Sequence, residues 1–393
     1  MIKREHYLRQ IRPFYESNLI KIITGIRRCG KSVIMDQIEN ELSQDGKKTL
    51  KLNFEDRAVS ASINTVDALI DYVTQHLGKE KLYVFLDEVQ TIEHWNVACR
   101  TLRLKNVSLF ITGSNSKLLS KEFTKELSGR YVAFRVRPFV FAEIQQYAKE
   151  LKQNYSIADY LVFGGFPQSI EFPTKEARLR YLNDLDDTIV INDILNRYKI
   201  RKDHLFRRLV NYVMISNARV FSANSVQKVL KGQGIDCSLN TIVKYLSYLE
   251  EAYVISPIRQ YSPKAKRELK YYQKLYIEDV SFNSIRQTDG HWDITHNLEN
   301  VVFNELLYRG FSLFVYKVDS QEIDFLAEKN NRQYLIQVAY SIAEESTYKR
   351  EFALFNKLDQ SREKIIITND DFDFSTSTVR HIKLKDFLLN ETL

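Results

Sequence analysis

The sequence has few of the residues that mark several classes of protein. Its 393 residues include only three cysteines, Cys29, Cys99 and Cys237, and their wide spacing excludes a disulfide framework and a cysteine zinc site. With 12 glycines, 6 prolines and no low-complexity segment, a disordered or fibrous chain is excluded as well. No apolar run approaches the ~18 residues of a membrane span, and the first residues lack the apolar core of a signal peptide. We expect a reduced, cytoplasmic protein with no membrane partner.

The sequence does have ample length and a moderate positive charge. The length predicts two to four domains, with enough chain for several hydrophobic cores. A net charge of +7 favours an acidic partner such as nucleic acid, although the charge is spread over a long chain. No internal repeat of fixed period is present.

An apolar, strand-like run leads directly into a glycine-rich loop, residues 25–32, with the pattern G-x-x-x-x-G-K-S. Gly25 and Gly30 allow a tight turn in which successive main-chain N–H groups face a polyphosphate. Lys31 is expected to reach the β- and γ-phosphates, and the Ser32 hydroxyl to complete a Mg²⁺ shell. The helix expected next directs its positive dipole end at the same anion. The residues expected to hold the nucleotide are Gly25, Ile26, Arg27, Arg28, Cys29, Gly30, Lys31, Ser32 and Val33.

Two adjacent acids, Asp87 and Glu88, end a second apolar run farther along the chain. The run, residues 81–89 with the two acids near its end, has no helical period and is typical of a strand buried on both faces. Acids at the carboxyl end of such a strand stand where open α/β sheets place their ligands. We expect Asp87 to hold Mg²⁺ and Glu88 to polarise the attacking water. An ordinary polar turn is the alternative, but it suits a lone acid better than a pair behind an intact phosphate loop.

Strand-like runs alternate with helical patterns over residues 1–138, which indicates an α/β fold with a parallel, helix-covered sheet. Beyond Pro138 the pattern becomes helical, and a helical segment after such a core commonly forms a lid over the nucleotide. The expected strands are 19–24, 49–53, 82–86, 108–112 and 131–136, and the later helices are 141–151, 157–163 and 175–197.

The pattern changes again after residue 203. Three helices, at 204–216, 222–230 and 238–250, precede a β-hairpin made of 253–258 and 270–277, which predicts a winged helix-turn-helix. Cations and tyrosines in the hairpin suit a nucleic-acid backbone. Lysine-rich hairpins also protect sheet edges, and winged helices in ATPases often mediate only protein contacts, so both roles stay open. The hairpin cations are Lys270 and Lys274 together with the four that we expect to contact nucleic acid, Arg259, Lys264, Lys266 and Arg267.

A third unit of mixed helices and strands is expected from about residue 285. Its helices are predicted at 296–309, 345–358 and 385–389, and its strands at 313–318, 322–328, 333–338 and 364–368.

Seven short motifs follow one another along the chain. They are TGIRRCGKS at 24–32, FLDEVQ at 85–90, ITGSNS at 111–116, LSGR at 127–130, LEN at 298–300, QEIDF at 321–325 and YLIQVA at 334–339. In these motifs the chain resembles the large prokaryotic group of AAA-type P-loop ATPases with a C-terminal domain of unknown function. The resemblance covers essentially the full length. It implies an AAA-type core at 1–138, a helical lid at 139–202, a winged helix at 203–284 and a restriction-endonuclease-like α/β domain at 285–393.

The resemblance also implies roles for residues beyond the phosphate loop. Asn115, or Ser114 beside it, would orient the attacking water. Arg130 fits an arginine finger presented to the nucleotide of a neighbouring subunit of a homo-oligomer. A solvent-exposed loop arginine and a phosphate contact within one chain are the alternatives for Arg130. The implied cofactors are ATP and Mg²⁺, and the absence of a guanine-reading N-K-x-D pattern agrees with ATP.

The C-terminal domain departs from the pattern of an active nuclease. A nuclease of this fold needs one acid on its first helix, one on a strand and an E-x-K tripeptide on the next strand, to hold Mg²⁺ and steady a hydroxide. Glu299 and Asp324 remain, but the tripeptide reads Gln337-Val338-Ala339. We therefore expect no nuclease activity, and a structural role for the two acids as caps or salt-bridge partners.

Three functions remain in competition. The leading one is a Mg²⁺-dependent ATPase whose hydrolysis cycle moves the winged-helix and nuclease-like domains, with nucleic acid as a candidate client. The second is a nucleotide-gated binding scaffold with negligible turnover. The third is an active nuclease, which the residues Gln337 and Ala339 disfavour.

Overall fold

The structure is a computed structural model that describes residues 2–114, 127, 129–261, 273–287, 290–318, 321–356, 358, 361–390 and 393. The chain divides into two compact units, Met1–Pro138 with Glu251–Tyr253 and Phe139–Glu250 with Val254–Leu393. Within these described residues, no helix is both long and apolar enough to span a lipid bilayer.

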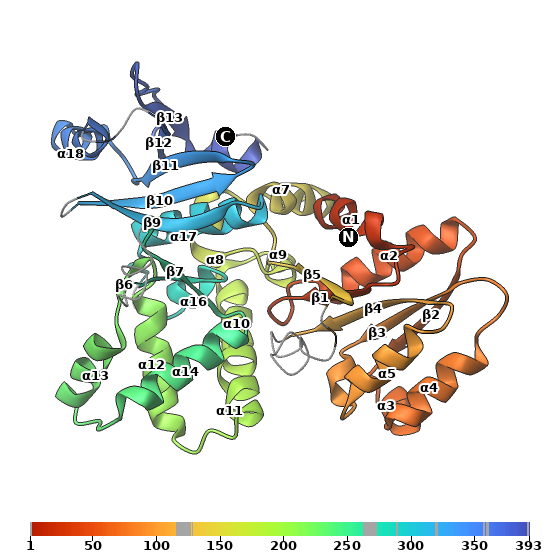
Figure 1. The fold of residues 1–393 in the computed structure, drawn as a ribbon. Coiled ribbons are helices and arrows are strands. Elements are labelled where there is room, and N and C mark those ends of the chain that lie inside the picture. Colours follow the sequence, from red (N-terminus) through yellow and green to blue (C-terminus); the bar gives the residue numbers. More distant parts are fainter. Residues whose placement is uncertain are drawn as a thin grey trace. The chain divides into compact units, whose positions relative to one another are not determined.

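The first unit is built around a five-stranded parallel sheet with the strand order β2-β3-β4-β1-β5 (Figure 1). The sheet confirms the predicted α/β fold, and each of the five predicted strands agrees with the structure to within one residue at either end. The strands are β1 (Ile20–Thr24), β2 (Lys48–Asn53), β3 (Leu82–Asp87), β4 (Val107–Gly113) and β5 (Tyr131–Arg135). The helices are α1 (Glu5–Ile11), η1 (Arg12–Phe14), α2 (Lys31–Gln44), α3 (Arg57–Ser62), α4 (Val66–Gln75), η2 (Val89–Thr91) and α5 (Trp95–Leu102).

The three central strands of this sheet, β1, β3 and β4, are buried at every residue. Each has a strand on both sides, and helices cover both faces: α2 lies on one side of the sheet and α3, α4 and α5 on the other (Figure 1). Leu69 and Val73 of α4 pack into the same core as Cys99 and Leu102 of α5. This double coverage explains why the strands are continuous apolar runs, and it leaves their carboxyl ends as the place for polar groups.

The second unit begins with helices that pack against later parts of the chain: α7 contacts α19, α8 contacts α17, and α10 contacts α16. They are α7 (Phe141–Glu150), α8 (Ile157–Phe163), α9 (Pro167–Ile170), α10 (Lys175–Asp186), the π-helical stretch η4 (Asp187–Asn192) and α11 (Asp193–Arg197). The helix predicted at 175–197 is therefore continuous apart from a change of helical type. The partners are α16 (Ser281–Ser284), α17 (Ile294–Tyr308) and α19 (Leu384–Leu389).

Three further helices and a small antiparallel sheet of the order β6-β8-β7 follow, with β6 between the first and second helix. The side chain of Ser222 accepts a hydrogen bond from the Ser225 N–H and so caps the N-terminus of the second helix. Strand β6 has only three residues, too few for an alternating pattern, and was not predicted from the sequence. The elements are α12 (Asp203–Ile215), β6 (Arg219–Phe221), α13 (Ala223–Gly232), α14 (Leu239–Glu251), β7 (Ile255–Arg259) and β8 (Gln273–Ile277).

A mixed five-stranded sheet of the order β13-β12-β11-β10-β9 forms the C-terminal part of this unit. Strands β9, β10 and β11 pair antiparallel, whereas β12 and β13 extend the sheet in parallel. The four predicted strands are present, and the fifth, β13, is a four-residue strand that the sequence pattern did not predict. The elements are β9 (Ser312–Val318), β10 (Gln321–Lys329), β11 (Arg332–Val338), α18 (Glu345–Asn356), β12 (Glu363–Thr368) and β13 (Arg380–Lys383).

A buried aspartate, Asp279, fixes the double-glycine turn between α8 and α9. Its carboxylate accepts hydrogen bonds from the Gly165 N–H at 2.7 Å and from the Ser281 N–H at 3.0 Å. A Cβ atom on Gly164, whose φ is +68°, would lie 1.7 Å from the Asp279 carboxylate oxygen, so only glycine fits this turn. Burial raises the pKa of Asp279 to about 6 in spite of these hydrogen bonds.

We predict that Asp279 makes the stability of the second unit depend on pH between about 4 and 6. The native state binds a proton there that the unfolded chain, with an ordinary aspartate pKa near ~3.9, has lost. The contribution of Asp279 to the free energy of unfolding should therefore be largest below pH ~4 and fall by roughly 2–3 kcal/mol as the pH rises through 6. Urea unfolding of the wild type and of Asp279→Asn, which is neutral at every pH, measures this. A difference between the two proteins that is the same at pH 4 and pH 7 would contradict the prediction.

Candidate nucleotide site

The glycine-rich loop of the first unit lies against the chain that follows β5. A Cβ atom on Gly25, whose φ is +148°, would lie 2.1 Å from the Val136 carbonyl oxygen, so the position requires glycine. Gly30, with a φ of +97°, is the N-cap of α2. The loop thus runs from the buried strand β1 into the N-terminus of a 14-residue helix, as the sequence predicts.

An arginine that sequence reasoning missed holds the same loop from its other side. The guanidinium of Arg4 donates to the Cys29 carbonyl at 2.9 Å and to the Arg137 carbonyl at 3.0 Å, and Arg4 is only 1% exposed. The Tyr7 hydroxyl accepts a hydrogen bond from the Arg137 N–H at 3.0 Å. The N-terminal segment therefore holds the glycine-rich loop in place. Nothing in the local sequence around Arg4 signals this long-range contact.

The lysine of the motif joins the loop to the pair of acids. Lys31 is buried, and its ammonium donates to the main-chain carbonyls of Gly25 and Ile26, both at 3.2 Å. The same ammonium lies 3.9 Å from a carboxylate oxygen of Glu88. Two motifs that are far apart in the sequence thus meet at one end of the sheet.

Asp87 and Glu88 are positioned by a threonine of the neighbouring strand. The Thr112 hydroxyl donates to the Asp87 carboxylate and accepts a hydrogen bond from the Glu88 N–H at 3.0 Å. Glu88 adopts a left-handed backbone conformation with a φ of +55°, which ends β3, and its side chain accepts hydrogen bonds from Gln90 and Ser114. Thr112 was part of a quoted motif, but its role was not predicted.

The other predicted nucleotide contacts lie in different environments. Ser32 is exposed in the first turn of α2, where its hydroxyl is accessible, and Val33 beside it is half-buried. Arg28 is exposed, whereas Arg27 forms an ion pair with Glu55 at 3.1 Å. Cys29 is buried, and its thiol donates to the Val136 carbonyl at 3.4 Å, as expected of a thiol with a packing role.

Some predicted site residues lie outside the described residues. These include Asn115, so its expected role stays a prediction, although Ser114 before it is buried beside Glu88. Arg130 is described: it is exposed immediately before β5, and its carbonyl accepts a hydrogen bond from the Ile20 N–H at 2.9 Å.

The hairpin cations do not share one environment. Arg259 is exposed at the end of β7, whereas Lys264, Lys266, Arg267 and Lys270 lie outside the described residues. Lys274 is buried and paired with carboxylates, so its interpretation as one of the cations that suit a nucleic-acid backbone is wrong. Glu299 and Asp324 are two of its partners, which confirms the predicted salt-bridge role of these acids.

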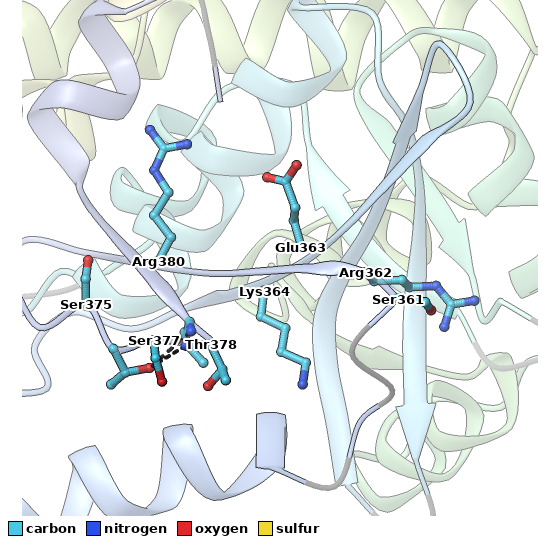
Figure 2. A pocket seen from close by; sticks show the side chains of 10 residues that line it. Ser361, Arg362, Glu363, Lys364, Ser375, Ser377, Thr378 and Arg380 are labelled. Carbon is cyan, nitrogen blue, oxygen red and sulfur yellow. Dashed lines mark hydrogen bonds between the residues drawn. The ribbon is translucent and has the colours of Figure 1, made fainter.

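A hollow at the surface of the second unit, between β12 and β13, is lined mainly by polar side chains (Figure 2). Lys364 is its buried cation, but the ammonium donates to the main-chain carbonyls of Phe355 and Leu358. Its charge is therefore already satisfied, and we assign no chemistry to this hollow. The lining residues are Ser361, Arg362, Glu363, Lys364, Ser375, Thr376, Ser377, Thr378, Val379 and Arg380.

Comparison with family models divides the chain into three matched segments. Residues 17–145 match a family described as an AAA domain. Residues 154–286 and 295–387 each match a domain of unknown function, DUF8612 and DUF4143 respectively. The phosphate loop and the acid pair both lie inside the AAA match.

Solved structures give weaker likenesses. AMPPCP-bound DnaA from Aquifex aeolicus matches with a TM-score of 0.34 and 14% identity, covering 64% of this chain and 89% of that chain. Drosophila ORC bound to AT-rich DNA and Cdc6 matches with a TM-score of 0.26 and 9% identity, covering 71% and 89%. Scores of this size do not establish a shared fold.

Two relatives match over nearly the whole chain. An uncharacterized protein of Haemophilus influenzae is 34% identical in an alignment of 384 residues that covers 94% of this chain and 93% of the relative. The uncharacterized protein MJ1544 of Methanocaldococcus jannaschii is 31% identical in an alignment of 379 residues that covers 90% of this chain and 83% of the relative. The chain therefore belongs to the family of these two proteins, and its first domain is a P-loop domain of the AAA type.

Proposed function

We propose that the protein is a Mg²⁺-dependent ATPase whose hydrolytic site lies in the first unit. The observation that carries this proposal is the 3.9 Å approach of the Lys31 ammonium to the Glu88 carboxylate. This approach brings a phosphate-binding loop and a pair of acids to one end of a parallel sheet. A loop alone would support binding, whereas an acid beside it supports activation of water.

The residues of the loop would bind the triphosphate. The main-chain N–H groups of the loop and of the first turn of α2 face an anion, and Lys31 adds a positive charge for the β- and γ-phosphates. The Ser32 hydroxyl and the Asp87 carboxylate are hard oxygen ligands of the kind that Mg²⁺ prefers beside phosphate oxygens, so they fit this metal. The ion would supply charge neutralisation at the phosphates. Thr112 holds the Asp87 carboxylate in place for this role.

Glu88 would act as the general base. Its carboxylate is held by hydrogen bonds from Gln90 and Ser114 and by the left-handed turn of its own backbone. A carboxylate fixed in this way can accept a proton from a water molecule without first reorganising. Asn115 would orient that water, and Arg130 would neutralise charge that develops on the γ-phosphoryl group.

The nucleotide state would be coupled to the rest of the chain. We propose a helical lid at 139–202, a winged helix at 203–284 and a restriction-endonuclease-like domain without nuclease activity at 285–393. Three helices together with the sheet β6-β8-β7 support the winged helix, and the mixed sheet with α17 before it supports the α/β character of the last domain. The second candidate, a scaffold that binds nucleotide without turnover, differs in one measurable quantity, the rate of phosphate release.

We predict that Glu88→Gln lowers the rate of phosphate release from ATP at least ~100-fold, because a general base contributes about that much. Binding of ATP should be unchanged, since an amide keeps the shape of the side chain. Phosphate release and nucleotide affinity are measured on the same preparations, with the exposed Glu93→Gln as a matched control that retains activity. Equal release by the wild type and Glu88→Gln would favour the scaffold.

A second prediction distinguishes an Arg130 that contacts the nucleotide of a neighbouring subunit from one that contacts the nucleotide of its own chain. Arg130→Ala should lower phosphate release by ~10³-fold or more if the guanidinium stabilises the transition state. When Arg130→Ala is mixed with Lys31→Ala, which cannot bind the γ-phosphate, activity should reappear because one subunit supplies the nucleotide site and the other the arginine. An inactive mixture places the arginine in the same chain, and full activity of Arg130→Ala alone removes it from the site.

A third prediction concerns nucleic acid as a client. Replacing Lys264, Lys266 and Arg267 together by glutamine should weaken binding to duplex DNA and reduce the slope of log affinity against log salt by roughly 2–3. Lys349→Gln on α18 is the control, because this lysine is exposed and lies far from residues 264–267 in the sequence. A triple variant with unchanged affinity and salt dependence would reject the hairpin as a nucleic-acid contact.

A further inference from the structure

One lysine of the second unit lies among three carboxylates. Lys274, on β8, places its ammonium 2.6 Å from Glu299 of α17, 3.1 Å from Glu322 and 3.0 Å from Asp324, both of β10. Glu322 and Asp324 are two residues apart and therefore share one face of their strand. An ammonium has three N–H donors, and here three carboxylates are within reach of them.

The carboxylates around Lys274 are themselves held in place. Asp324 accepts a hydrogen bond from the Val338 N–H at 3.0 Å, and the Gln337 side-chain oxygen accepts one from the Asp324 N–H at 3.2 Å. Glu299 accepts a hydrogen bond from the Tyr276 hydroxyl at 2.6 Å. Gln337 and Val338, which replace part of a nuclease E-x-K tripeptide, thus serve to position Asp324.

Helix α17 attaches β8 at a second point next to the lysine. The side chain of Asn300 accepts from the Ile277 N–H and donates to the Ile277 carbonyl, both at 2.9 Å. The ring of Tyr276 stacks on Phe303 with a centroid distance of 4.0 Å. Each residue of the motif at 298–300 therefore has a structural role: Leu298 is buried, Glu299 pairs with Lys274, and Asn300 holds the end of β8.

The charge on Lys274 is essential to this arrangement. Burial alone would lower the pKa of Lys274, but the carboxylates of Asp324, Glu299 and Glu322 outweigh burial and raise it, so the ammonium keeps its proton. Without that positive charge, acids that are mostly buried would face one another with no counter-ion, which is strongly unfavourable.

We propose that Lys274 is the resident cation of this carboxylate cluster: its ammonium takes the place that a metal ion would occupy, joins β8 to α17 and β10, and keeps divalent metal ions out of the cluster. In the part of the chain that the structure describes, no group of histidine, cysteine, aspartate or glutamate is arranged to hold a metal ion. This role of Lys274 is independent of the proposed ATPase site, because Lys274 and its carboxylate partners all lie in the second unit.

The first test is the thermal stability of Lys274→Met, which keeps an unbranched side chain one atom shorter and removes its charge. Its melting temperature should fall by roughly 10 °C, since breaking a buried ion pair is strongly destabilising. The matched control is Lys364→Met, which removes a buried ammonium that donates to the neutral carbonyls of Phe355 and Leu358. Adding Glu299→Gln and Asp324→Asn to Lys274→Met should recover much of the loss. Equal losses in the two single variants, or no recovery, would overturn the proposal.

The second test needs only proteins that retain Lys274 and so stands even if Lys274→Met does not fold. Binding of Mn²⁺ to nucleotide-free wild type and to Asp324→Asn is followed by the electron paramagnetic resonance signal of the free ion. The two Mn²⁺ titrations should coincide, because the Lys274 ammonium already occupies the centre of the carboxylate cluster. A bound Mn²⁺ ion that the wild type holds and Asp324→Asn loses would overturn the proposal.

Discussion

The close approach of the Gly25 main chain to the Val136 carbonyl oxygen is the constraint on which the proposed site depends. It leaves no room for a side chain at Gly25 and turns the loop out of β1 toward the N-terminus of α2. Arg4 completes the constraint, because one guanidinium ties the far end of the loop to the Arg137 carbonyl. The loop is thus held by the chain before β1 and by the chain after β5. A backbone fixed in this way can present its N–H groups to an anion without rearranging first.

Two buried lysines, Lys31 in the first unit and Lys274 in the second, have different kinds of partner. Lys31 lies near Glu88, and its ammonium donates to two main-chain carbonyls. A phosphate oxygen can take the place of these carbonyls as the hydrogen-bond partner. Lys274 is surrounded by three acids that are anchored by their own hydrogen bonds, so its position is fixed. The first arrangement suits a site that binds and releases a ligand, and the second suits a permanent structural contact. The polar centre of the C-terminal domain therefore contributes to architecture, and the chemistry we propose belongs to the first unit.

The sequence predicted the features that are encoded locally. The buried strands, the phosphate loop and the acids Asp87 and Glu88 each follow from a short run of residues, and the structure agrees on the strands and brings the loop and the acids together. The roles of Arg4 and Thr112 could not be predicted, because each depends on a partner far away in the chain. Lys274 was misread for the same reason: it was counted as one of several hairpin cations, and only the fold shows the acids around it. Strands β6 and β13 were missed because three or four residues carry no periodicity.

The measurement that tests the central claim most directly is a calorimetric titration of Mg·ATP into the full-length wild type and into Lys31→Ala. The account predicts one bound nucleotide per chain for the wild type, with an affinity at least ~10-fold lower in the variant, because Lys31 supplies the charge for the β- and γ-phosphates. The variant should retain the fold, since the polar contacts of Lys31 within the described residues are to Gly25, Ile26 and Glu88 of the site itself. No binding to the wild type, or equal binding to a folded Lys31→Ala, would contradict a nucleotide site at residues 25–32.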